Sequence, residues 1–287
     1  MPSDNPDRSQ PPKAFWRRAI AERHYSDLEE LWGPIPLTRS DRIATAGSCF
    51  AQHIGNNLQR RGATFLDLEP APPVFADEAE ARRFGFGVYS CRYGNIYTSR
   101  QLLQLFDEAF GHRTPTERVW GRDGRFFDAL RPSVDPVGQE DAATVLALRG
   151  QHLGRVREMF RHLDLFVFTM GLTEGWEAVA DGTMYPAAPG TICGSFDAEK
   201  YRFHNLRYGE ILQDMQAFWE RLKGVNPQAR MLLTVSPVPL TTTATGGHVL
   251  TATTYSKSVL RAVAGDLAAD HAEIGYFVGF EQRLQAD

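Results

Sequence analysis

Apolar runs alternate with amphipathic helical segments along most of the chain, and this alternation constrains the fold more than any other feature. The clearest run is residues 164–170, where the sequence DLFVFTM is almost continuously apolar. Such runs suit strands that are covered on both faces, as in parallel sheets. Because strands separated by helices imply βαβ crossovers, the pattern predicts a three-layer α/β/α domain with a parallel sheet. Further strands are predicted at 42–46, 231–235 and 274–280, and helices at 50–62, 99–110, 140–163, 208–222 and 256–271.

Two segments do not follow this alternation. Residues 1–36 are predicted to form a disordered lead-in, 1–13, and an outer helix or irregular wrap, 15–32, before an α/β domain at 37–287. Residues 66–135 are rich in Gly, Pro, Arg and aromatic side chains, which predicts an irregular insertion that lines or covers a site. Its aromatic residues either bind flat or sugar-like groups or pack in the core; they are Phe86, Tyr89, Tyr93, Tyr97, Trp120, Phe126 and Phe127.

Composition excludes several classes of protein. A formal net charge of −4 argues against a nucleic-acid-binding role, which needs a basic face. The sequence contains no apolar run of about 18 residues, so no membrane span is predicted. The N-terminus does not resemble a secretory signal. The three cysteines are far apart in sequence, which indicates neither a disulfide framework nor a zinc site. We therefore expect a cytoplasmic protein without a bound metal, and the oligomeric state is left open.

Small and polar residues follow three of the predicted strands. These segments are 47–49, 171–174 and 236–239. Because ligand sites of parallel sheets gather at the carboxyl ends of the strands, the three loops are expected to converge on one site.

The first of these loops carries two candidate nucleophiles, Ser48 and Cys49, at the start of a predicted helix. The N–H groups of a helix N-terminus favour negative charge, so a thiol or hydroxyl there can be activated. Gly47 suits the tight turn that precedes them. An ordinary corner with a serine cap and a buried cysteine explains the same spacing equally well.

Five ordered blocks of sequence resemble the GSCFA family, which is related to the SGNH (GDSL-like) esterases. The blocks span residues 37–280 and are GSCFA at 47–51, YGNIYT at 93–98 followed by Gln101-Leu102, GLTEGW at 171–176, SPVP at 236–239, and YSKSVLR at 255–261. The resemblance implies a flavodoxin-like, SGNH-type sheet and ester or acyl chemistry, often on carbohydrates.

The resemblance also implies roles for individual residues. The SGNH nucleophile follows a Gly-Asp pair at the end of the first strand, so Cys49 falls at the nucleophile position and is favoured over Ser48. Gly94 or Asn95 would supply the second oxyanion donor of these enzymes. Thr173 stands where the SGNH pattern has an asparagine and would offer a hydroxyl instead.

The base of the SGNH pattern has no counterpart in this sequence. The pattern places an Asp-x-x-His motif after the last strand, and no histidine follows His271. His248, in a glycine-flanked loop, is the favoured replacement, although an exposed loop histidine is an equal alternative. His53, one helical turn beyond Cys49, and His204 are weaker candidates.

Two further charged residues have alternative interpretations. Glu174 would either orient a base, bind a substrate hydroxyl or cap the next element. Lys257 is predicted to be a solvated lysine in the first turn of its helix, with contact to a phosphate or coenzyme as the alternative.

These observations predict an esterase or O-acyltransferase that acts on a small-molecule or carbohydrate-like substrate. No resident cofactor is expected, and acyl-CoA is the alternative acyl donor. The competing class is a non-catalytic protein that binds a carbohydrate or CoA on a degenerate SGNH-like fold. A dinucleotide site is disfavoured because the first turn lacks Gly-x-Gly-x-x-Gly.

Overall fold

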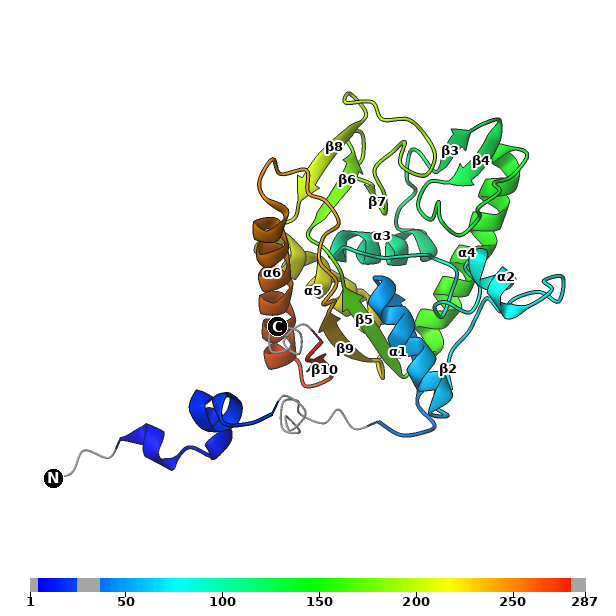
Figure 1. Cartoon of the computed structure of the whole chain (residues 1–287). Helices are drawn as coiled ribbons and strands as arrows, with labels where there is room; N and C mark the ends of the chain where they lie inside the picture. The colour runs from blue at the N-terminus through cyan, green and yellow to red at the C-terminus, as the bar shows by residue number, and fades with distance from the viewer. Residues whose placement is uncertain (1–4, 25–36, 280–287) are drawn as a thin grey trace.

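A five-stranded parallel sheet forms the centre of the computed structural model, which describes residues 5–24 and 37–279 (Figure 1). Its spatial order is β10-β9-β5-β1-β2. Numbered along the chain, these five strands have the order 2-1-3-4-5, which is typical of doubly wound α/β sheets. The strands are β1 (Arg42–Gly47), β2 (Thr64–Phe65), β5 (Leu165–Met170), β9 (Arg230–Val235) and β10 (Ile274–Phe277).

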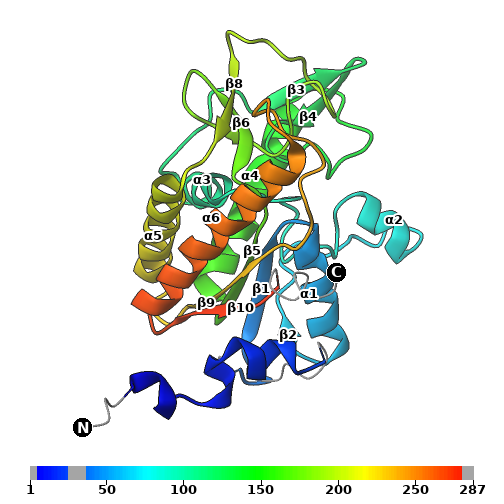
Figure 2. The same ribbon diagram turned by 60° about the vertical axis from the view of Figure 1, so that its left-hand side comes forward.

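Helices cover both faces of this sheet, which gives the predicted three-layer α/β/α arrangement (Figure 2). Successive side chains of a strand point to opposite faces. Ile43, Leu165 and Val167 therefore pack against α1 (Cys49–Arg60), whereas Phe166 and Phe168 belong to the larger core on the other face. That larger core also involves α3 (Ser99–Ala109), α4 (Ala142–His162), α5 (Tyr208–Val225) and α6 (Val249–Asp270). Within the described ranges, no helix combines the length and the apolar character needed to cross a bilayer.

The predicted helices and strands of the core are present, with shifted ends. Helix α6 begins at Val249 rather than Ser256, and α5 continues through Gly224 to Val225. The predicted last strand ends at Phe277, and its final residue, Phe280, lies outside the described residues. The described part of the N-terminal segment contains short turns of helix at Pro6–Ser9, Pro12–Ala14 and Arg17–Ala21. Residues 25–32 of the predicted outer wrap also lie outside the described residues.

Two small antiparallel sheets that the sequence did not predict lie beyond the carboxyl ends of the parallel strands (Figure 1). The first has the order β7-β6-β8 and follows directly from β5; the second is the hairpin β3–β4. Trp120 joins them, since its ring lies 4.7 Å from that of Tyr185 and 6.2 Å from that of Tyr201. The strands are β3 (Val119–Arg122), β4 (Arg125–Asp128), β6 (Glu174–Ala178), β7 (Met184–Tyr185) and β8 (Tyr201–Asn205). The hairpin and α2 (Glu78–Arg83) both belong to the 66–135 segment.

Candidate active site

A cavity of about 630 Å³ lies at the carboxyl edge of the parallel sheet. The order of the strands reverses between β1 and β5, and ligands of doubly wound sheets bind at this switch point. All three predicted loops contribute to the cavity wall, and the antiparallel sheet adds Trp176 and Phe203. The loop residues are Ser48, Cys49, Gly171, Leu172, Glu174, Ser236, Val238 and Pro239. The convergence expected of the parallel sheet is therefore present.

The turn between β1 and α1 is fixed by close packing. Gly47 has φ +138°, and a Cβ added there would lie 2.4 Å from the carbonyl oxygen of Thr169. Only glycine fits this position, because L side chains rarely adopt such backbone angles. The next N–H, that of Ser48, donates to the same Thr169 oxygen at 3.2 Å. Cys49 is then the first residue of α1, and its thiol is exposed at the cavity.

Ser48 occupies the N-cap position of α1 without capping it. Its side chain is 3% exposed, makes no cap hydrogen bond and has no partner for Oγ among the described residues. The N–H groups of Cys49 and Phe50 likewise have no acceptor within the described part of the chain. Since the first N–H groups of a helix lack intrahelical partners and favour negative charge, this turn is suited to hold an anion beside the Cys49 thiol.

The YGNIYT segment contributes a different residue from the two that the sequence suggested. Gly94 lines a separate cavity of about 210 Å³, together with Gln52 and Arg82. Asn95 lines that smaller cavity too, and its amide contacts Tyr89 and Tyr97. Tyr97 is the member of the segment that lines the main cavity.

Thr173 and Glu174 follow β5 and lie in different environments. Thr173 is fully buried; its N–H donates to Ser256 Oγ at 3.1 Å, and its hydroxyl donates to Asn205 Oδ1 at 2.7 Å. It does not line the main cavity, whereas Glu174 does. Glu174 accepts a hydrogen bond of 2.8 Å from the Thr243 hydroxyl, which ties the loop before α6 to the cavity wall.

None of the three candidate histidines lines the main cavity. His248 is exposed at the N-cap of α6, where its Nδ1 accepts a hydrogen bond from the N–H of Leu250 at 3.1 Å. His53 is exposed on α1. His204 contacts two carboxylates, Glu177 at 3.0 Å and Glu210 at 2.9 Å.

The prediction for Lys257 is wrong. It lies well inside α6, its side chain is 1% exposed, and its Nζ donates to the carbonyl oxygen of Gly171 at 2.6 Å. Gly171 packs closely on Ser48, because a Cβ added to it would lie 3.2 Å from Ser48 Cβ. Among the described residues, Lys257 is the one Lys, Arg or His that lines the main cavity, and it does so next to the β1–α1 turn.

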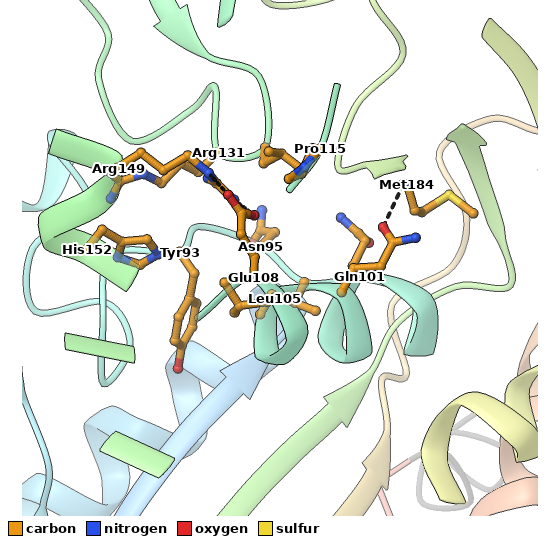
Figure 3. A pocket seen from close by; sticks show the side chains of 13 residues that line it. Tyr93, Asn95, Gln101, Leu105, Glu108, Pro115, Arg131, Arg149, His152 and Met184 are labelled. Carbon is orange, nitrogen blue, oxygen red and sulfur yellow. Dashed lines mark hydrogen bonds and ion pairs between the residues drawn. The ribbon is translucent and has the colours of Figure 1, made fainter. Parts of the chain in front are cut away.

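A third cavity, of about 30 Å³, is lined by Tyr93 and Asn95 and by buried charged side chains (Figure 3). Arg149 donates from Nε to Glu108 at 2.6 Å and from Nη1 to Asp128 at 2.9 Å. Burial alone would raise the pKa of Asp128, but Arg149 and Arg131 outweigh burial and lower it to about 2. Arg131 also donates to the carbonyl oxygen of Arg92 at 3.0 Å. The cluster of Glu108, Asp128, Arg131 and Arg149 therefore contacts the backbone immediately before the Tyr93–Tyr97 segment, through Arg131.

Gln101 and Trp176 line the main cavity and were not predicted as site residues, whereas Tyr97, which also lines it, was predicted only as one of seven aromatic residues that either bind a ligand or pack. A signal for Tyr97 was present in the sequence, because Thr98-x-x-Gln101 is a capping box at the start of α3. That motif places Tyr97 directly before a helix N-terminus. No cluster of three or more His, Cys, Asp or Glu side chains suited to a metal ion occurs within residues 5–24 and 37–279.

Comparison with known proteins identifies the family. No curated protein and no solved structure matches the sequence. The model of the GSCFA family matches residues 42–286, which include the whole α/β domain described above. The chain therefore belongs to the GSCFA family.

Proposed function

We propose that this protein transfers or hydrolyses an acyl group, with Cys49 as the nucleophile and a carbohydrate-like molecule as the substrate. One observation carries the proposal: the exposed Cys49 thiol begins α1 and lines the largest of the described cavities. A relation to SGNH esterases is part of the proposal. It is supported by the 2-1-3-4-5 strand order and by the position of Cys49 at the start of α1, one residue beyond the end of the first strand.

In the proposed mechanism, the Cys49 thiolate attacks the carbonyl carbon of an ester. The carbon–oxygen bond of the ester breaks, and the departing alkoxide takes the proton that the Cys49 thiol had lost, which leaves a thioester on Cys49. Water or a sugar hydroxyl then attacks this thioester and releases the thiol. The N–H groups of Cys49 and Phe50 would stabilise the oxyanion, since they have no other acceptor among the described residues.

His248 remains the predicted base, which carries this proton from the Cys49 thiol to the departing alkoxide. His248 does not line the cavity that contains Cys49, so the loop 241–248 would have to move to bring the imidazole to the thiol. Ser48 is the alternative nucleophile, and its Oγ has no described partner.

The walls of the cavity support a carbohydrate-like substrate. Trp176 and Phe203 provide aromatic surface, and Thr241, Thr242 and Thr243 line the same space. A sugar ring has apolar faces that pack on aromatic side chains and hydroxyls that bond to polar groups. The volume of about 630 Å³ is typical of small-molecule sites.

Turnover of p-nitrophenyl acetate by the wild-type protein, Cys49→Ala and Ser48→Ala tests the nucleophile. We expect Cys49→Ala to abolish turnover and Ser48→Ala to leave a measurable rate. Equal rates in all three proteins would refute the proposal. Cys91→Ala is the control, because Cys91 is a buried thiol that does not line the main cavity.

A second assay separates hydrolase from transferase. We propose a cytoplasmic location, which would give the protein access to CoA thioesters as acyl donors. Release of CoA from acetyl-CoA should increase with sugar acceptors if the protein is a transferase. Equal release in water alone would indicate a hydrolase.

A non-catalytic binding protein is the second candidate, because none of the candidate histidines lines the cavity. Alkylation of Cys49 by iodoacetamide distinguishes the two functions. A thiol that reacts only above about pH 8, as an unperturbed cysteine does, would favour binding without catalysis.

A further inference from the structure

A chain of hydrogen bonds leads from α1 to the main cavity. Gln52 Nε2 donates to the Tyr89 hydroxyl at 3.2 Å, and this hydroxyl lies 2.5 Å from Asn95 Oδ1. Asn95 Nδ2 then donates to the Tyr97 hydroxyl oxygen at 2.8 Å. The chain ends at Tyr97, which lines the cavity together with Cys49.

The orientation of the Asn95 amide sets the direction of this chain. The amide oxygen faces the Tyr89 hydroxyl, which also lies 3.2 Å from the carbonyl oxygen of Ser48. The amide nitrogen must then face Tyr97, and 2.8 Å is normal for N–H···O. The Tyr97 oxygen is thereby occupied as an acceptor, while its own hydrogen has no acceptor within the described residues.

The backbone of Tyr97 is held on both sides. Its N–H donates to Gln101 Oε1 at 3.0 Å. Its carbonyl oxygen accepts bonds of 3.0 Å from both Gly171 and Leu172, in the loop after β5. Burial and the nearby negative charge of an ionised Cys49 raise the pKa of the Tyr97 hydroxyl, so the hydroxyl keeps its proton at neutral pH.

We propose that Tyr97 is a further catalytic residue, whose hydroxyl donates a hydrogen bond to the negative charge that develops beside Cys49. Asn95 is the positioning residue, because its amide nitrogen occupies the Tyr97 oxygen and leaves the Tyr97 hydrogen for the cavity. This inference deepens the proposed function and rests on it. It also changes the role predicted for Asn95, which acts through Tyr97 and does not contact the oxyanion itself.

Substitutions with almost no change in volume test the proposal. Loss of one oxyanion donor lowers kcat by about 10²–10³-fold, so Tyr97→Phe should reduce kcat for p-nitrophenyl acetate by about that factor with little change in KM. Asn95→Asp should cause a similar loss, because a carboxylate accepts the Tyr97 hydrogen and turns it away from the cavity. Tyr201→Phe is the control, since Tyr201 is buried outside the main cavity and its hydroxyl donates to Glu117. Unchanged kcat in Tyr97→Phe or Asn95→Asp would overturn the inference.

A second measurement does not depend on turnover. The pH profile of Cys49 alkylation should move upward in Tyr97→Phe, because the same hydroxyl also donates to the Cys49 thiolate, the first negative charge of the reaction. Burial raises the pKa of the Cys193 thiol to about 11 and raises that of Cys91 well above its ordinary value, so alkylation below pH 9 reports Cys49. An upward shift in a protein without esterase activity would support the Tyr97 donor and refute the proposed function. An unchanged profile would refute the donor itself.

Discussion

Replacing Arg149 by methionine should destabilise the fold strongly, because Arg149 neutralises two buried carboxylates. Its side chain is 4% exposed, and those of its partners Glu108 and Asp128 are 6% and 8% exposed. Methionine retains much of the apolar contact of the arginine stem but none of its hydrogen bonds. Arg131 would still pair with Asp128, so Glu108 would remain buried without a cationic partner among the described residues.

The Asp128 carboxyl shows how much the two arginines of this cluster contribute to stability. Its pKa lies at about 2 instead of the ordinary 3.8, which corresponds to about 2.5 kcal/mol of stability. Because the folded-state pKa is lowered, this contribution is present above pH 3.8 and is lost as the pH falls towards 2. Breaking a buried ion pair from one side costs about 3–5 kcal/mol, so we expect a loss in that range at pH 7.

Urea unfolding of the wild-type protein and Arg149→Met measures this loss, and Arg161→Met is a matched control. Arg161 lies on the same helix, but its side chain is 50% exposed, and its contact with Glu158 is 3.4 Å. A surface pair of this kind contributes about 0–1 kcal/mol. The loss in Arg149→Met should be smaller at pH 5 than at pH 8, since an unpaired buried carboxyl takes up a proton more readily. Equal losses in the two variants would refute the reasoning.

Three further predictions concern the turn, a buried histidine and the cavity wall. Gly47→Ala should lower the free energy of unfolding by at least about 2 kcal/mol. Gly62→Ala should lower it by only about 1 kcal/mol, because a Cβ added at Gly62 would meet no other atom. Burial and, next, the charge of Arg131 lower the pKa of His152 to about 4, so the free energy of unfolding should fall as the pH drops from 6.5 towards 4. Urea unfolding at a series of pH values measures this fall, and His152→Gln should make it smaller. Trp176→Ala should raise KM for an acylated sugar more than it lowers kcat; an unchanged KM would exclude the aromatic wall from substrate binding.

The parallel sheet was predictable from sequence because its strands are buried on both faces. Phe166 and Phe168 point into one core and Leu165 and Val167 into the other, so the whole of β5 reads as apolar. The antiparallel sheet gave no such signal. Its strand β7 has two residues, and β6 is only partly buried over Glu174–Trp176, so neither shows a periodic apolar pattern.

The location of the candidate site could be predicted from the sequence, but most of the side chains that line it could not. Strand ends locate the loops, but the partners of a side chain depend on contacts between distant segments. Thr173 bonds to Asn205 and Ser256, which lie far along the chain, and is thereby buried away from the cavity. Lys257 was mistaken for a surface residue because lysine is rarely buried without a specific contact, here the carbonyl oxygen of Gly171.

Mass spectrometry of the protein after brief reaction with p-nitrophenyl acetate tests the central claim most directly. The mechanism predicts one acetyl group on the peptide that contains Cys49, attached as a thioester that hydroxylamine removes at neutral pH. Tyr97→Phe should form this species more slowly, and Cys49→Ala should not form it. Acetylation of Ser48 with Cys49 unmodified, or turnover without any acetylated peptide, would contradict Cys49 as the nucleophile.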